Sequence, residues 1–497
     1  MTYLLLHTGQ EQTELLARHL GCECATMLPD AIPSFIIQWG NTGLSGLQLN
    51  QVVLNGAEAI GLASSPAIRQ HLLSQSGVPT GKKNKPVRTI RRYVAIVFQQ
   101  EVMALFKSSG SSLWQHSRTT ENDNYKEIEV NPVIREIRHI LQYAVRSIYI
   151  LGLDFGAVYF GVDIDGRIRV LDVRSAFPLT EKLAAQFASC VKLFAAGYFT
   201  KQNGEMMLGA DPEFMLRTPG GKLVVASRYF PKKGVVGCDR VWLRGDLSHK
   251  HLPLAELRPE PAQEPKELLR NLYYAMLLGN RKVNEPNIEW VAGGLPFSGY
   301  PTGGHIHFSG VEVNSQLLRA LDTYLALPVF MIEGPGSRQR RPRYGFPGDF
   351  RKKSHGGFEY RTLASWLASP VATRGVFALS RLIAHSYRRL TRHLFLNPEV
   401  QRAYFTGNKG AMACYVPAIW GELESLEQYA AYADYLDPFK KMVFAREEWD
   451  EDSDIRRVWK LPPYDSWMQD HQKKAVCYNV ERRKHVQERE IWQNTHR

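Results

Sequence analysis

Two short segments in the second half of the chain place acidic and imidazole side chains at a spacing that suits metal-dependent chemistry. Asp211 and Glu213 are two residues apart in GADPEF, and His305 and His307 are two residues apart in GGHIHFSG. If these segments are β-strands, alternate side chains share a face, so both members of each pair point the same way. Crowded carboxylates repel one another and need a cation, which a divalent metal supplies. An isolated His-x-His is more often one buried and one surface histidine, so the prediction depends on the other segments.

Two further segments add to this set. LAELRPEPAQE contains Glu256 and, as a second acidic group, either Glu260 or Glu264. In GGFEYRTL, Glu359 and Arg361 share a face of an expected strand. The basic segments SRQRRPRYG and GDFRKK precede that strand, and guanidinium and ammonium groups bind phosphates. Each pattern alone is weak, but together they indicate an enzyme that handles a metal-bound nucleotide.

The composition sets the class of protein. At 497 residues the chain is long enough for two or three domains, and 44% apolar with 22% charged residues is typical of a globular protein. No apolar run reaches the length of a membrane helix, and MTYLLLHTG is expected to be a first strand and not a signal peptide. Six sparse cysteines indicate reduced thiols and a cytoplasmic location. The net charge of +13 favours anionic partners.

The order of elements predicts an α+β protein with two domains, at residues 1–204 and 205–497. In the first, a helix in VNPVIREIRHILQYAVRSIYILG leads into a hairpin that turns at Asp165-Gly166. In the second, strands come early and helices late. The segment EPKELLRNLYYAMLLGNRKV is an expected helix with an apolar stripe from Leu268 to Met276.

The ordered motifs GADPEF, ELRPEP, GGHIHF, YGFPGDFR and FEYRTL resemble the glutamine synthetase and glutamate–cysteine ligase superfamily. Within it, they are most similar to the phage-type COOH–NH2 ligases (amidoligases). The resemblance implies a glutamine-synthetase-like domain, with a curved antiparallel sheet and flanking helices. It also implies ATP, two or more Mg²⁺ or Mn²⁺ ions, and formation of an amide (peptide or isopeptide) bond between a carboxylate and an amine through an acyl phosphate.

The same resemblance implies a role for each residue. His307 would hold the carboxylate substrate, Arg361 would grip substrate or phosphate, and Arg351 would stabilise charge during phosphoryl transfer. This family commonly has glutamate at the position of Asp211, and the shorter aspartate still suits a metal. The implied metal ligands are Asp211, Glu213, Glu256, Glu264, His305 and Glu359, and the implied ATP-binding residues are Arg351, Lys353 and Arg341.

The first part of the chain resembles the ATP-grasp ligases, through IIQWGNTG, VLNGAEAI, SQSGVPT, YVAIVF and LDFGAVYFGVDIDGRIRVLDV. That family has magnesium-binding carboxylates and an asparagine on its last hairpin. Here Tyr159, Asp172 and Arg174 stand at those positions, and an arginine opposes a bound cation. The glycine-rich segment over the nucleotide is reduced to GKKNKPVRTI. We therefore expect an ATP-grasp-like domain that has lost its catalysis.

Three alternative functions compete with the ligase. A metal-dependent hydrolase would use the His-x-His, but here the histidines follow acidic strands and no regular βα repeat comes after them. A nucleic-acid-binding protein would use the SRQRRPR cluster, but it would leave the acidic strands unexplained. A non-catalytic scaffold is the third. The expected partners are a carboxylate and an amine from an amino acid, a peptide or a polymer precursor, with no membrane, no nucleic acid and a possible homo-oligomer.

Overall fold

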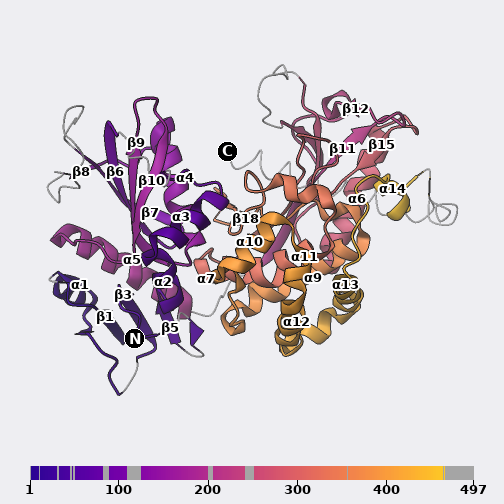
Figure 1. The fold of residues 1–497 in the computed structure, drawn as a ribbon. Helices are drawn as coiled ribbons and strands as arrows, with labels where there is room; N and C mark the ends of the chain where they lie inside the picture. The colour runs from indigo at the N-terminus through magenta and orange to yellow at the C-terminus, as the bar shows by residue number, and fades with distance from the viewer. Residues whose placement is uncertain are drawn as a thin grey trace, which may run out of the picture.

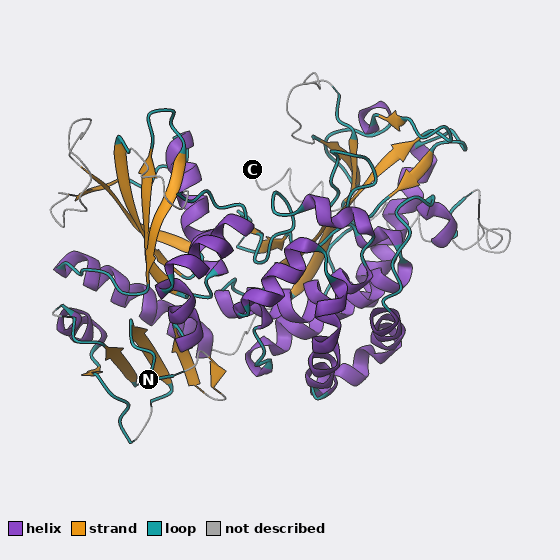
Figure 2. Cartoon of the chain, in the orientation of Figure 1, coloured by secondary structure: helices purple, strands orange, loops and turns teal. Residues whose placement is uncertain are grey.

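The computed structural model is α+β, and its described residues form three β-sheets (Figures 1 and 2). It describes residues 2–10, 12–30, 33–44, 47–48, 51–81, 89–108, 125–199, 205–240, 251–354, 356–462 and 464. The first two sheets come from the first half of the chain, and the third begins at Met207. Within these ranges, every helix is too short or too polar to cross a lipid bilayer.

The first sheet is mainly parallel, with the strand order β2-β1-β3-β5-β4. Its third strand, β3, is buried over all five residues, as expected for a parallel strand covered on both faces. Only the short β4 runs antiparallel to its neighbour. The strands are β1 (Tyr3–His7), β2 (Glu23–Ala25), β3 (Phe35–Trp39), β4 (Leu47–Gln48) and β5 (Gln51–Leu54). Helix α1 (Thr13–Leu20) packs with this sheet, and α2 (Ala57–Ser64) and α3 (Pro66–Gln75) follow it in the chain.

The second sheet is antiparallel, with the order β10-β9-β6-β7-β8. Alternate residues of its central strands point to opposite faces and enter two separate cores. One core includes helix α4, and the other includes helix α5. Helix α5 lies between this sheet and the first (Figure 1). The hairpin turns at Asp165-Gly166, as predicted. The elements are β6 (Arg91–Phe98), β7 (Glu101–Ser108), β8 (Tyr125–Ile128), α4 (Arg135–Ile150), β9 (Phe155–Val162), β10 (Ile168–Arg174) and α5 (Glu181–Phe199).

The third sheet is antiparallel and has the order β13-β14-β11-β16-β18-β17, with β12 and β15 also paired to the long strand β11. This confirms the antiparallel sheet expected for the second half. Its strands are β11 (Met207–Arg217), β12 (Leu223–Val224), β13 (Val236–Asp239), β14 (Leu254–Leu257), β15 (Glu289–Val291), β16 (Gly304–Ser309), β17 (Phe350–Lys352) and β18 (Phe358–Tyr360).

Helices cover one face of this sheet, and most of them follow its last strand in the chain, as the sequence predicts. The expected stripe of α6 is buried at Leu268, Leu272 and Met276. The helical segment that follows β16 is interrupted by one π-helical turn at Asp322–Ala326. The helices are α6 (Pro265–Lys282), α7 (Ser315–Leu321), α8 (Leu327–Ile332), α9 (Pro370–Ser386), α10 (Pro398–Thr406), α11 (Lys409–Met412), α12 (Val416–Glu424), α13 (Ala433–Ala445) and α14 (Ile455–Val458).

Two sequence predictions fall on residues outside those described. The predicted domain boundary at residues 204 and 205 adjoins the segment 200–204, and most of the shortened GKKNKPVRTI segment lies in 82–88. Both stay predictions.

Asp154, directly before β9, links the first two sheets to helix α7 of the second half. Its Oδ2 accepts a hydrogen bond of 2.8 Å from the backbone N–H of Asn55, which follows the first sheet. Its Oδ1 lies 2.9 Å from Nη1 of Arg319 on α7, and the side chains of Asp154 and Arg319 are 8% and 11% exposed. Arg319 also donates to the carbonyl groups of Gly152 and Leu153. The two halves of the chain therefore share a buried ion pair.

We expect Asp154→Ala to destabilise the protein by about 3–5 kcal/mol, because it leaves the buried guanidinium of Arg319 without its counter-charge. Asp165→Ala is the control, since its pair with Arg167 is more than half exposed on both sides and is worth at most about 1 kcal/mol. Urea unfolding followed by tryptophan fluorescence measures both values. Equal effects of the two substitutions would contradict the buried link.

Candidate active site

Most of the predicted site residues lie along one line across five strands of the third sheet. Residues directly opposite each other on antiparallel strands point to the same face. The pairing therefore brings the acidic, imidazole and basic groups of separate motifs onto one face. The opposed pairs are Glu256 with Glu213, Asp211 with His305, His307 with Glu359, and Arg351 with Glu359.

The opposite face of the same strands is apolar, and this fixes the orientation of the site residues. Phe308 of β16 stacks on Phe358 of β18 with ring centroids 4.9 Å apart, and Phe214 of β11 stacks on Trp290 at 4.5 Å. All four rings belong to the core below the sheet. A shift of one residue in register would move these rings to the other face, so the core holds the site residues in place.

His305 lies between two carboxylates at the centre of the line. Its Nδ1 is 3.1 Å from Oδ1 of Asp211 and 3.3 Å from Oε1 of Glu359. Burial opposes the charge on His305, but the negative charge of Asp211 outweighs this and raises its pKa to about 9. At neutral pH the ring is therefore an imidazolium. A Cβ atom at Gly303 would lie 2.3 Å from Nε2 of this ring, so only glycine leaves room for it.

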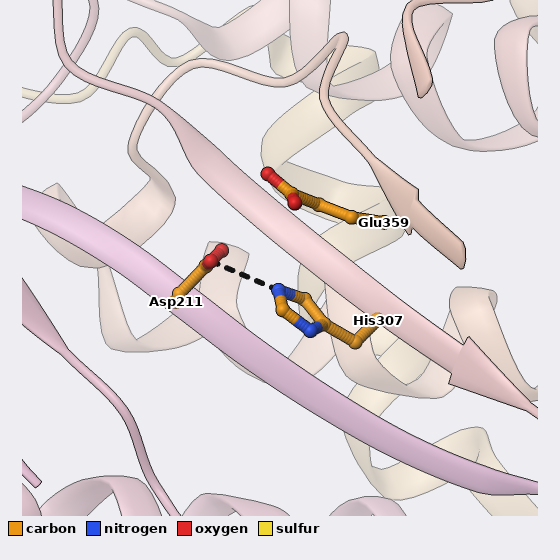
Figure 3. Close-up of side chains that lie close together, drawn as sticks. All are labelled: Asp211, His307 and Glu359. Carbon is orange, nitrogen blue, oxygen red and sulfur yellow. Dashed lines mark ion pairs between the residues drawn. The ribbon is translucent and has the colours of Figure 1, made fainter. Parts of the chain in front are cut away.

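Asp211, His307 and Glu359 form the group best placed to hold a divalent cation (Figure 3). Each offers one ligand atom, and these atoms all lie within 4.8 Å of one another. Oδ2 of Asp211 is 2.9 Å from Nε2 of His307. Burial opposes ionisation of Asp211, but the charge of His305 outweighs it and holds the pKa of Asp211 far below its usual range.

The chemistry of this donor set fits Mg²⁺ or Mn²⁺. Two carboxylates and one imidazole are ligands that such ions accept. Three buried atoms of the group make ion-pair contacts but no hydrogen bond of normal geometry with any described residue: Oδ1 of Asp211, Nε2 of His307 and Oε2 of Glu359. Buried polar atoms left in this state are costly unless an ion or water binds them. The sequence predicted His305 as the ligand here, and the geometry favours His307.

Glu213 and Glu256 extend the acidic line toward β14. Oε2 of Glu213 accepts a hydrogen bond of 2.6 Å from the backbone N–H of Gly303, and Oε2 of Glu256 contacts Nη2 of Arg258. Burial and the nearby charge of Asp211 raise the pKa of Glu256 to about 8, and burial also raises the pKa of Glu213. Glu256 therefore carries a proton at neutral pH when no cation is near.

Three cationic side chains surround Glu359 at the other end of the line. Oε2 of Glu359 is 2.5 Å from Nζ of Lys353 and 3.6 Å from Nη1 of Arg351, and Oε1 is 3.1 Å from Nε of Arg361. Burial opposes ionisation of Glu359, but His305, Lys353 and Arg351 lower its pKa. Arg351 is 56% exposed, so its charge is available to a bound anion. The predicted basic groups are thus beside the predicted acidic ones.

The structure does not bring two of the predicted residues to this line. Glu264 is 57% exposed and contacts Arg381 and Tyr432 at the start of α6. Arg341 is buried against Glu333 and over the ring of Tyr404. Both are held by partners elsewhere in the second half.

Two buried residues that the sequence analysis did not assign are further candidates for the site. Arg340 is buried, and its positive charge acts on Glu213. Asp349 is also buried, and its backbone carbonyl accepts a hydrogen bond of 2.8 Å from the N–H of Arg361. Asp349 lies in the GDFRKK motif, so the sequence contained a signal for it. In the segment SRQRRPR, nothing in the sequence distinguished Arg340 from the neighbouring arginines as a site residue.

On the last hairpin of the first half, the carboxylate of Asp172 is paired with arginines and not with histidines. Asp172 and Tyr159 are paired across β10 and β9. Oδ1 of Asp172 is 2.8 Å from Nη2 of Arg69, and Oδ2 is 2.9 Å from Nε of Arg174. The guanidinium of Arg174 lies 4.8 Å from the ring centroid of Tyr159. Both oxygens of this carboxylate are therefore engaged by arginines.

A comparison with protein families identifies the second half. The model of the family described as phage phiEco32-like COOH·NH2 ligase-type 2 matches residues 208–461, which is just over half of the chain. The match includes every predicted site residue from Asp211 to Arg361. Among curated proteins, no sequence matches this chain.

Solved structures that match this chain include ATP-grasp ligases. PsnB complexed with minimal precursor has 10% identity and a TM-score of 0.30, and the match covers 39% of this chain and 99% of PsnB. Macrocyclase MdnB from Microcystis aeruginosa has 12% identity, a TM-score of 0.26, and coverage of 38% and 98%. The RimK domain protein ATP-grasp from Sphaerobacter thermophilus has 11% identity, a TM-score of 0.28, and coverage of 38% and 98%. Likeness at these TM-scores is too weak to carry an argument about the first half.

Cation binding to this site is expected to strengthen as the pH rises from 7 to 9. The pKa of Glu256 is about 8 and that of His305 about 9, so both hold protons at pH 7 that a divalent cation must expel. Each proton released corresponds to about a tenfold rise in affinity per pH unit. Titration calorimetry with Mn²⁺, in two buffers of different ionisation enthalpy, measures the affinity and the protons released. Affinity that does not change over this pH range would contradict the assigned protonation states.

Proposed function

Because the chain belongs to the phage phiEco32-like COOH·NH2 ligase-type 2 family, we propose that it joins a carboxylate to an amine at the expense of ATP, through an acyl phosphate. The observation that carries the proposal is the line across β14, β11, β16, β18 and β17, where acidic, imidazole and cationic groups meet on one face. Membership in a family of C–N bond-forming ligases also argues against the hydrolase, nucleic-acid-binding and scaffold alternatives.

The chemistry explains why both signs of charge are needed. A carboxylate is a poor electrophile, and transfer of the γ-phosphoryl group of ATP makes it an acyl phosphate that an amine can attack. The products are an amide, ADP and phosphate. This first step gathers negative charge from the carboxylate and the phosphates at one place. Mg²⁺ or Mn²⁺ held by Asp211, His307 and Glu359 would supply positive charge there, with Glu213 and Glu256 as further ligands.

The basic end of the line binds the nucleotide in this proposal. Arg351 and Lys353 contact the phosphates, because both flank Glu359 and Arg351 projects into solvent. Arg361 is 25% exposed and is held by Glu359, so its remaining donors face the carboxylate substrate or its phosphate. His307 is 26% exposed and lies at the same face, and as a ligand of the cation it would hold the ion beside the carboxylate substrate. The substrates are an amino acid, a peptide or a polymer precursor.

The first half takes no part in the phosphoryl transfer in this proposal. The two arginines that contact Asp172 would repel a divalent cation. They also occupy the carboxylate oxygens that would have to bind it. One nucleotide site per chain is therefore proposed, in the second half.

One MgATP is expected to bind per chain, and the double variant Glu213→Ala with Glu359→Ala is expected to lose it. Both carboxylates lie on the line, and their removal leaves the cation without two of its five proposed ligands. Asp172→Ala is the matched control in the first half and should keep one site. Titration calorimetry with MgATP gives the stoichiometry without knowledge of the substrates.

A site that survives the double substitution but is lost in Asp172→Ala would place the nucleotide in the first half. No binding by the wild type would overturn the ligase proposal.

Arg351→Ala is expected to bind MgATP and to form acyl phosphate about 10²–10³-fold more slowly, because a positive charge aimed at the transferring group is removed. The assay supplies amino-acid and peptide pools as acids and hydroxylamine as the amine, and measures hydroxamate and ADP. Arg402→Ala is the control, since Arg402 is 58% exposed on α10 and pairs with Glu399. An equal loss in both variants would contradict the assigned role, and ADP release without hydroxamate would contradict the acyl phosphate.

A further inference from the structure

The first half of the chain contacts the strand hairpin that carries the basic end of the site. We propose that it acts as a positioning element for the cation-binding group, through Tyr149 of α4 and Asp322 of the π-helical turn. This inference rests on the proposed function, because it concerns the same site. It assigns a task to a half of the chain that the ligase chemistry does not otherwise use.

The carboxylate of Asp322 is the centre of the contact. Its Oδ2 accepts a hydrogen bond of 2.7 Å from the hydroxyl of Tyr149, which comes from the first half. Its Oδ1 accepts one of 2.6 Å from the hydroxyl of Tyr360 and one of 3.1 Å from the backbone N–H of Gly348. Asp322 and Tyr360 are fully buried, and Tyr149 is 7% exposed. Because these groups are buried, water could not replace a hydrogen-bond partner that one of them lost.

Tyr360 connects this network to the chemistry. It lies between Glu359 and Arg361 in sequence, and side chains alternate along an extended segment. Glu359 and Arg361 therefore point to the site, while Tyr360 points to the core where Asp322 holds it. The bond to Asp322 fixes the strand from behind and sets the direction in which both site residues project.

The ring of Tyr149 also supports the hairpin directly. Gly348 has a φ of +72°, and a Cβ atom there would lie 2.2 Å from Cε1 of Tyr149. The backbone of the hairpin therefore lies flat against the ring, at a position that only glycine can fill. The next residue, Asp349, accepts the hydrogen bond from the N–H of Arg361. A displacement of Gly348 would be passed to Arg361 through this single residue.

Two further contacts from the first half reach the same segment. The guanidinium of Arg146, one turn before Tyr149 on α4, lies 3.3 Å from the ring centroid of Phe346. Glu101 of β7 contacts Lys352 of β17, the neighbour of both Arg351 and Lys353. Contacts from the first half thus reach the segment 346–352 at its beginning, in its middle and at its end.

The position of Asp322 in the helix agrees with this task. The segment α7–α8 would be one continuous helix, but a π-helical turn begins at Asp322. Such turns are rare, and they are frequently found at functional sites. Here the turn places a carboxylate under the site strand and against the first half.

The test uses the full-length protein and the substitution Tyr149→Phe, which removes the hydroxyl and keeps the ring against Gly348. We expect Mn²⁺ to bind at least about tenfold more weakly, as is usual when a residue that orients a metal ligand is lost. Electron paramagnetic resonance measures the free Mn²⁺, and thermal unfolding is recorded for the same samples. Tyr93→Phe is the matched control, because its hydroxyl donates a 2.6 Å hydrogen bond to Glu136 within the first half.

A second pair of variants separates the hydrogen-bond network from the charge. Asp322→Asn keeps an acceptor for Tyr360 and Gly348 and offers its amide N–H to the hydroxyl oxygen of Tyr149. We expect it to bind Mn²⁺ within about threefold of the wild type, whereas Asp322→Ala weakens binding as Tyr149→Phe does.

Mn²⁺ binding by Tyr149→Phe that equals the wild type would overturn the inference and leave the ligase proposal standing. Weakening by the same factor in Tyr93→Phe would also overturn it, since loss of stability in the first half would then explain both. Failure of the wild type to bind Mn²⁺ would overturn the cation site itself, and with it the positioning role.

Discussion

The structure of the second half depends on one electrostatic constraint, the gathering of carboxylates on a single face of a sheet. Asp211, Glu213, Glu256 and Glu359 lie on neighbouring strands and in a partly buried setting where their repulsion is not screened by water. Without a cation, the imidazolium of His305 and the proton on Glu256 reduce this repulsion. The apolar stacks on the other face supply the free energy that keeps the strands in register against it.

The same constraint explains why the basic groups come from a separate hairpin. Strand β18 ends at Tyr360, and β17 pairs with it so that Arg351 and Lys353 meet Glu359 from the far side. A short two-stranded element at a sheet edge is weakly held by its own hydrogen bonds. Besides the pairing of β18 with β16, support comes from outside the sheet, from Tyr149 and Arg146 of α4 and from the buried carboxylate of Asp322. The site is therefore a product of both halves of the chain, although its reacting groups all belong to one.

Alternation along strands made most of the site predictable from the sequence. Motifs such as GADPEF and GGHIHF lie within β11 and β16, and the period of two correctly places their polar side chains on one face. Residues outside strands had no such rule. Glu264 follows a strand end and begins α6, and Arg341 follows a 3₁₀ turn, so spacing alone could not tell where their side chains would point. The role of Asp322 could not be predicted for another reason. It is the single carboxylate of an apolar helical segment, so no spacing between acidic residues marked it as functional.

The two halves also show how a structural ion pair differs from a site that can bind a cation. On the last hairpin of the first half, Asp172 is neutralised by two arginines, whose charge is permanent at any physiological pH. On the third sheet, Asp211 is neutralised by the imidazolium of His305, and a proton on an imidazole can be exchanged for a metal ion. Glu359 stands between these cases, since it faces His305 on one side and Lys353, Arg351 and Arg361 on the other. It is thus the residue at which a bound cation and the phosphates that it accompanies would meet, and the ligase chemistry requires such a meeting point.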